Sequence, residues 1–142
     1  MNEKAYDKAI KLLSVRLHTT GELFQKLKTR GFSNQKIQPV LRELERLNFL
    51  DDKRFAEIFV DNLKRYKDFG YYGIKAKLLI RHVPSEIAEE ALKEFFTAED
   101  EMAVARRLLS KKKRQGVKEY EKLIRVLASR GFRNEIIGLV LE

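Results

Sequence analysis

The sequence contains no cysteine and no tryptophan, and only two prolines and two histidines among its 142 residues. Without cysteine, the chain can form no disulfide, no zinc site built on thiolates and no cysteine nucleophile, which is the usual situation in the reducing cytosol. The two histidines, His18 and His82, belong to different parts of the chain. We therefore expect no metal site.

Long apolar runs and catalytic motifs are also absent. No stretch approaches the ~18 apolar residues of a membrane span, and the first ten residues, MNEKAYDKAI, lack the apolar core of a signal peptide. Neither GxxxxGK[ST] nor HExxH occurs. Gly70 and Gly73 in DFGYYG follow no strand, so we expect them to turn the chain between helices, and we expect Asp51 and Asp52 to cap a helix. These absences predict a soluble, cytoplasmic protein that is not an enzyme and needs no cofactor.

One stretch of the sequence occurs twice, one hundred residues apart. Residues 27–41, LKTRGFSNQKIQPVL, and residues 127–141, LASRGFRNEIIGLVL, share eight identities without a gap. That spacing is too long for one repeat unit of ~20 to 50 residues, so a third copy is expected between them. Residues 78–92, LLIRHVPSEIAEEAL, fit this place, with His82 where the other copies have glycine and Val83 where they have phenylalanine.

Apolar residues recur along the chain with the spacing of an α-helix. Ile37, Val40, Leu41 and Leu44 follow the i, i+3, i+4, i+7 pattern, and similar stripes predict nine helices in three groups of three. We expect an all-α fold of tandem three-helix repeats, at residues 1–50, 51–96 and 97–142, the last with a short third helix. Because each repeat is too small to bury a good core alone, the repeats should stack into an elongated, curved molecule.

The predicted helix ends carry recognisable capping residues. Thr19 with Glu22, and Thr97 with Asp100, have the spacing of a capping box. Glycines follow three helices, at Gly31, Gly116 and Gly131, where a left-handed residue closes the last turn. His82 must adopt the same conformation at higher cost or make a different turn. The phenylalanines after two of these glycines, Phe32 and Phe132, are expected at equivalent buried positions.

The net charge of +9 is concentrated at the two ends of the chain. Lysine and arginine outnumber aspartate and glutamate by 10 to 5 in residues 1–50 and by 11 to 5 in residues 101–142, against 9 to 11 between them. A first basic set flanks Phe69, Tyr71 and Tyr72, and consists of Lys64, Arg65, Lys67, Lys75, Lys77 and Arg81. A second is the run Lys111, Lys112, Lys113 and Arg114, part of which can serve its own helix terminus. The first set converges on one side of two helices or is scattered around both, and together the two sets indicate an extended, negatively charged partner.

Two classes of binding protein fit these features. Three-helix repeats could read DNA as helix-turn-helix units do, or they could dock on a protein polymer. The third helix of the middle repeat, SEIAEEALKEF, carries Glu86, Glu89, Glu90 and Glu94, a face that phosphates would repel. Sequence-specific DNA reading is therefore the alternative rather than the first interpretation.

Four segments resemble the RecX family, the regulators of the bacterial recombinase RecA. They are AIKLLSVRLHTTGELFQKLKTRG, LNFLDDKRFAEIFV, DFGYYGIKAKLLIRHV and VLASRGFRNEIIGLVL, and together they span nearly the whole chain. Two positions depart from the family pattern, because Asp68 and His82 replace glycines.

The resemblance implies a non-catalytic protein that lies in the groove of the RecA filament on single-stranded DNA. It also implies a role in homologous recombination, DNA repair and the SOS response, in which RecX proteins mostly inhibit the recombinase, ATPase and coprotease activities of RecA. We expect a monomer with weak, non-specific nucleic-acid binding and no membrane contact. The expected contact residues are Lys64, Arg65, Lys67, Tyr71, Tyr72, Lys75, Lys77, Arg81, Lys111, Lys112, Lys113 and Arg114.

Overall fold

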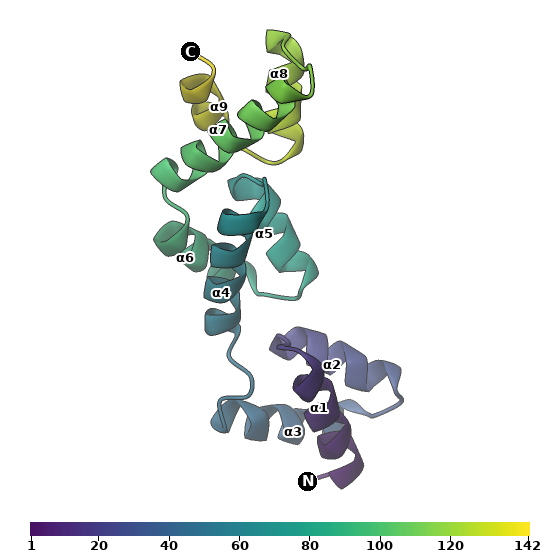
Figure 1. The fold of residues 1–142 in the computed structure, drawn as a ribbon. Coiled ribbons are helices and arrows are strands. Elements are labelled where there is room, and N and C mark those ends of the chain that lie inside the picture. Colours follow the sequence, from purple (N-terminus) through teal and green to yellow (C-terminus); the bar gives the residue numbers. More distant parts are fainter.

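The computed structural model describes all 142 residues and contains nine α-helices and no strand. The helices are α1 (Glu3–Val15), α2 (Thr20–Thr29), α3 (Asn34–Arg46), α4 (Asp52–Tyr66), α5 (Tyr71–Ile80), α6 (Ser85–Phe95), α7 (Ala98–Arg114), α8 (Tyr120–Ser129) and α9 (Asn134–Val140). Successive groups of three follow one another along an elongated molecule with the two termini at opposite ends (Figure 1). The predicted all-α architecture of tandem three-helix units is confirmed. No helix is both long and apolar enough to cross a lipid bilayer.

The helix ends follow the predicted capping chemistry. Both capping boxes form, at the N-termini of α2 and α7. Gly31, Gly116 and Gly131 have φ angles of 92°, 92° and 81°, in the left-handed region where a β-carbon is costly. His82 adopts the same conformation, with φ of 62°, so the middle repeat keeps the turn despite its side chain. Helix α3 begins at Asn34 and continues through Pro39.

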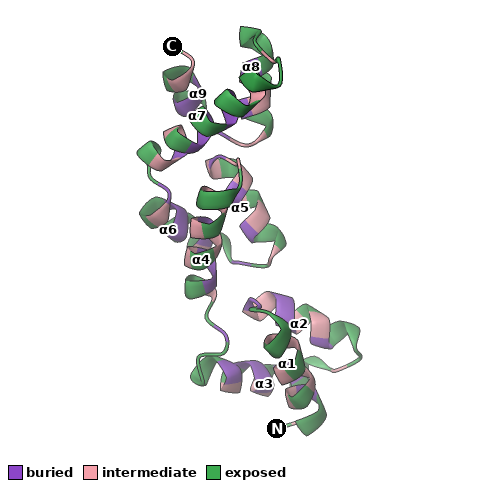
Figure 2. Ribbon diagram, in the orientation of Figure 1, coloured by how far each residue is buried: buried purple, intermediate pink, exposed green.

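The buried apolar residues form two separate cores. One lies within residues 1–50, here called the arm, and ends with Leu50, which is 3% exposed. The other extends through α4 to α9, within residues 51–142, here called the body, and begins with Phe55. The second and third helix groups therefore share a core, while the first stands apart (Figure 2). Phe132 is buried in the body, but Phe32 is only half-buried in the arm, so their predicted equivalence in burial is wrong.

The two glycines of DFGYYG are required by packing within the body. The backbone N–H of Gly70 donates to the carbonyl oxygen of Arg130, and that of Tyr72 donates to Gly131, both at 2.9 Å. A β-carbon on Gly70 or Gly73 would overlap the backbone of the turn between α8 and α9. The start of α5 can therefore approach this turn only with glycine at both positions.

The same arrangement recurs between the arm and the body. The first N–H of α2, at Thr20, donates to Oδ1 of Asp52 at 2.8 Å, just as the first N–H of α5, at Tyr71, donates to Oε2 of Glu101 at 3.0 Å. In both cases a carboxylate on the first turn of one helix group accepts a hydrogen bond from the first backbone N–H of the second helix in the preceding group. That N–H has no partner within its own helix. Asp51 caps its own helix, as predicted, through Arg54 N–H at 3.1 Å. Asp52 instead caps α2 across the junction.

Candidate functional site

Four residues of the first basic set are held in ion pairs with acids. Lys64 Nζ lies 3.5 Å from Asp100 and donates to the carbonyl oxygen of Phe95 at 3.1 Å. The other pairs are Arg65 with Asp61 at 2.9 Å, Lys75 with Glu89 at 2.7 Å and Arg81 with Glu22 at 2.8 Å. Their partners lie on four different elements, namely the start of α7, α4 itself, α6 and α2. Of the two alternatives left open by the sequence, convergence on one side and scatter around both helices, the structure therefore has scatter for these four residues.

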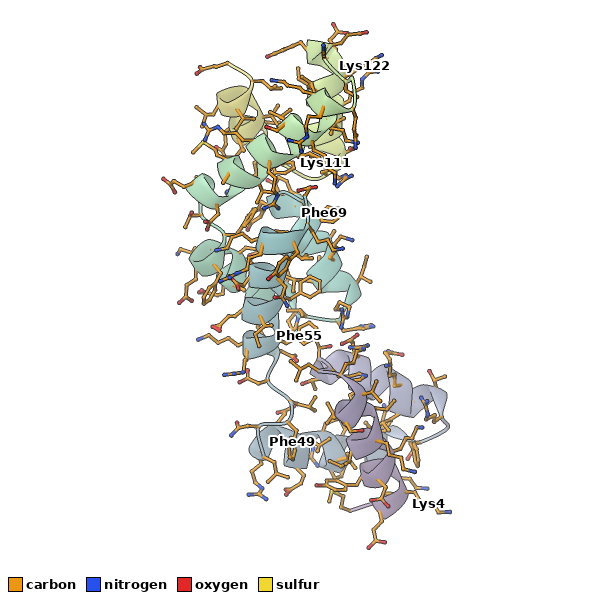
Figure 3. The ribbon with its side chains drawn as sticks, viewed as in Figure 1. Lys4, Phe49, Phe55, Phe69, Lys111 and Lys122 are labelled. Carbon is orange, nitrogen blue, oxygen red and sulfur yellow. The ribbon has the colours of Figure 1, made fainter.

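Three other predicted residues come together beside Phe69. Lys67, Lys77 and Lys111 line one groove with Arg130, at the seam between the second and third helix groups. We call it the basic groove; its lining is Phe59, Leu63, Tyr66, Lys67, Asp68, Phe69, Lys77, Lys111 and Arg130. Figure 3 shows Phe69 and Lys111 close to one another on successive helix groups. Lys75 lies outside the basic groove. A helix turns by roughly 200° over two residues, which places Lys75 on the opposite side of α5 from Lys77.

The ring of Phe69 supports two of the four cations of the basic groove. Lys77 Nζ lies 4.4 Å from the ring centroid of Phe69, and Arg130 Cζ lies 5.4 Å from the same centroid. Such contacts hold a cation over an aromatic face without neutralising its charge. Tyr66 is 75% exposed at this groove. The groove thus offers positive charge together with an accessible aromatic ring.

One carboxylate, Asp68, organises the basic groove. It accepts from Arg107 Nε at 3.0 Å and lies 3.4 Å from Lys111 Nζ. Burial alone would raise the pKa of Asp68, but the hydrogen bonds from Arg107 and Lys111 outweigh burial and lower it. Arg107 also donates to the carbonyl oxygens of Lys64 and Lys67, so it fixes the end of α4 against α7. With four cations and one anion in its lining, the groove keeps a surplus of positive charge.

The remaining predicted residues lie outside the basic groove. Tyr71 is half-buried beneath Arg133, whose Cζ is 4.6 Å from its ring, while Tyr72 is exposed in a separate hollow beside Arg133 and Asn134. The rest of the second basic set, residues 112–114, occupies the last turn of α7 and makes no ion pair. Arg130 was not among the predicted contact residues, because its position in the repeated sequence Arg-Gly-Phe indicated only the end of a helix.

A second groove, between α4 and α6, is acidic. Its lining is Lys53, Glu57, Glu86, Ile87, Glu90, Ala91 and Glu94. The four glutamates predicted to repel phosphate are all exposed on α6. These exposed carboxylates disfavour entry of α6 into a DNA groove in the way that the recognition helix of a DNA reader enters.

Each of the three helix groups matches a separate domain model of one protein family. Models of the first, second and third three-helix domains of RecX match residues 5–44, 51–92 and 99–141 in turn. The chain belongs to the RecX family. Among curated relatives named regulatory protein RecX, that of Prosthecochloris aestuarii is 37% identical over 139 residues, covering 98% of this chain and 92% of the relative. That of Chlorobium phaeobacteroides is 32% identical over 141 residues, covering 99% and 93%.

Solved RecX structures share the fold. The crystal structure of RecX from Lactobacillus salivarius superimposes with a TM-score of 0.89 at 26% identity, over 97% of this chain and 92% of that one. A second crystal structure, of a regulatory protein RecX, gives a TM-score of 0.87 at 22% identity, over 96% and 71%. The RecX relatives are named as regulatory proteins, which agrees with a regulatory rather than a catalytic role.

Proposed function

We propose that this RecX-family protein binds, through its basic groove, the filament that RecA forms on single-stranded DNA. Bound along the filament groove, it restrains the recombinase, ATPase and coprotease activities of RecA, and thereby acts in homologous recombination, DNA repair and the SOS response. The observation that carries the proposal is the gathering of Lys67, Lys77, Lys111 and Arg130 around Phe69 in a protein of a regulatory family.

The chemistry of the basic groove suits an extended anionic partner. Lysine and arginine bind phosphates or carboxylates of any sequence, and an exposed ring such as Tyr66 can stack on an unpaired base. The groove is also well supported, because Arg107 and the shared core of the body hold its two walls together. A preorganised groove loses less conformational entropy when a partner binds.

The acidic groove favours a filament over duplex DNA alone. Exposed carboxylates on α6 would lie against phosphates if all three helix groups bound the DNA backbone in the same way. They can be accommodated on a partner that combines protein and nucleic acid. We therefore expect weak, salt-sensitive and sequence-indifferent binding to naked DNA by a monomeric protein.

A charge-reversal variant tests this proposal. Lys67 and Lys77 form no ion pair with an acid, so K67E/K77E changes the groove without leaving a buried carboxylate unpaired. The control is K4E/K11E, which makes the same charge change on exposed residues of α1. Inhibition of DNA-dependent ATP hydrolysis by RecA should require at least about tenfold more of the groove variant than of the control.

The two variants should melt close to the parent, because surface substitutions usually change stability by about 0.5 kcal/mol or less each. Equal inhibition by the groove variant and the control would show that the basic groove does not contact the filament. Reversal of Lys64, Arg65 and Lys75 is less informative, since two of these three also support α6 and α7.

A further inference from the structure

The arm and the body are joined by a single short stretch of chain. Leu50 is packed in the core of the arm, and residues 48–50 are tied back to α3 by backbone hydrogen bonds, including Phe49 N–H to Leu44 at 2.9 Å. Helix α4 of the body begins at Asp52. Asp51, the first residue of the body, is therefore the one residue between the core of the arm and helix α4, and rotation about its backbone would turn the arm as a whole.

Few hydrogen bonds and ion pairs join the arm to the body, and beside them Gly21 of α2 packs closely against His82. Thr19 Oγ1 donates to the carbonyl oxygen of Arg81 at 2.6 Å, Thr20 N–H donates to Asp52, and Arg81 Nε donates to Glu22 at 2.8 Å. No buried apolar cluster spans this junction, whereas the seam within the body runs through a shared core. Regions joined without buried apolar contacts separate at low free-energy cost.

The linker also has open space on two sides. One hollow is lined by Leu17, His18, Asn48, Phe49, Asp51, Arg54 and Phe55. Another is lined by Thr20, Glu45, Asn48, Leu50, Asp51, Asp52, Lys53 and Ile87. Figure 3 shows Phe49 and Phe55 on either side of the extended linker. The arm can thus change its angle without displacing a packed core.

One ion pair dominates the junction. The Glu22 side chain is only 9% exposed and lies between Arg16 of the arm, at 3.0 Å, and Arg81 of the body, at 2.8 Å. The Arg81 guanidinium is held on its own side by the rings of Phe55 and Phe59, with Cζ at 5.1 and 5.6 Å from their centroids. Loss of the charge on Glu22 would remove the strongest attraction between arm and body.

We propose that the arm turns as a rigid unit about Asp51, and that the Glu22–Arg81 ion pair latches it in the orientation seen here. The latch weakens as salt rises, and an anion that takes Arg81 from Glu22 releases it. This inference concerns the isolated protein and holds whether or not it binds a filament. If the proposed function is correct, the hinge lets one molecule follow filaments of different pitch.

The absence of cysteine makes the hinge directly measurable. Cysteines introduced at the exposed positions Lys28 in the arm and Lys113 in the body would carry the only two spin labels. Double electron–electron resonance then gives the distribution of arm-to-body distances. A second pair, at Glu90 and Lys113, lies wholly within the body and reports on its rigidity.

The test variant is E22Q, which removes the charge but keeps an oxygen for the capping contact with Thr19 N–H. Its control is E43Q, which breaks an exposed pair with Arg46 that lies wholly within α3. The arm-to-body distribution should be narrow in the parent and in E43Q at low salt, and roughly doubled in width in E22Q. The distance distribution of the label pair within the body, at Glu90 and Lys113, should not change.

The variant R81Q removes the arginine of the Glu22–Arg81 pair instead of the glutamate. It should broaden the same distribution of arm-to-body distances. If both E22Q and R81Q keep the parental distribution, there is no latch. If the pair within the body broadens equally, the motion is not a rotation about Asp51. Either result overturns the proposal, and circular dichroism of each variant confirms that the helices are intact.

Discussion

Glu101 offers the sharpest test of how the body is held together. Its side chain is fully buried, and its two carboxylate oxygens meet four donors. Oε2 accepts from the backbone N–H groups of Tyr71 at 3.0 Å and Arg133 at 3.1 Å. Oε1 lies 2.7 Å from Arg133 Nε and 2.6 Å from Arg133 Nη2. One side chain therefore ties α5, α7 and the start of α9 together.

The substitution E101Q keeps the shape of this side chain and removes its charge. One of the two oxygens becomes an amide NH₂ group that faces other donors, whichever way the amide is turned. Breaking a buried ion pair costs about 3 to 5 kcal/mol, but the Arg133 side chain is 26% exposed and can be partly hydrated. We therefore expect a loss of about 2 to 4 kcal/mol in the free energy of unfolding.

Urea and thermal unfolding followed by circular dichroism measure this loss, which corresponds to a decrease of about 6 to 16 °C in Tm. The matched control is E135Q, because Glu135 approaches the same arginine at 4.0 Å but is 72% exposed at its side chain. The control should lie within about 0.5 kcal/mol of the parent. Equal stability of E101Q and E135Q would show that the buried carboxylate does not hold the body together.

Three further predictions concern packing and pH. Gly73→Ala should lower the free energy of unfolding by more than about 2 kcal/mol, because the added methyl group meets the α8–α9 turn. Gly138 lies on a helix with open space around it, so Gly138→Ala should raise this free energy by up to about 1 kcal/mol. Urea unfolding of the two variants measures both changes. Phe132→Ala should cost about 3 to 5 kcal/mol and Phe32→Ala clearly less, since only Phe132 is fully packed; equal losses by the same assay would contradict this. Burial alone would raise the pKa of Glu22, but hydrogen bonds from Arg16, Arg81 and Thr19 lower it from 4.5 to about 2. Its contribution is therefore complete above pH 4.5 and is lost as the pH falls towards 2, so the urea midpoints of the parent and E22Q should converge over that range.

The helices could be predicted because their signals are local. Apolar spacing, capping boxes and glycines after helix ends each depend on residues within one or two turns of the chain. At His82 the sequence left two alternatives, a left-handed residue or a different turn, and the structure has the left-handed residue. The three copies of one sequence segment, at residues 27–41, 78–92 and 127–141, then indicated that the nine helices form three groups.

The pairing of charges could not be predicted, because it depends on neighbours that are distant in sequence. Lys64 and Lys75 look like free surface cations, yet they meet Asp100 and Glu89 only after the helices pack. Arg130 joins the basic groove from a helix group far along the chain. A basic residue could be recognised in the sequence, but whether it was available to a partner could not.

The division into arm and body was hidden for a related reason. Three similar repeats suggest three similar junctions, and the capping carboxylates Asp52 and Glu101 do occupy equivalent positions. Only one of the two junctions also carries a continuous apolar core. That difference arises from side chains that meet across separate helix groups, which periodicity within a helix does not report.

We infer that the partner of this protein is a RecA filament rather than DNA itself. The most direct test of this inference is the affinity of the parent protein for RecA filaments on single-stranded DNA, compared with its affinity for several naked DNA sequences at one salt concentration. We expect tight binding to filaments and weak binding to every naked DNA, with little dependence on sequence. Strong preference for one duplex sequence, with no gain on filaments, would contradict it and favour a helix-turn-helix DNA reader.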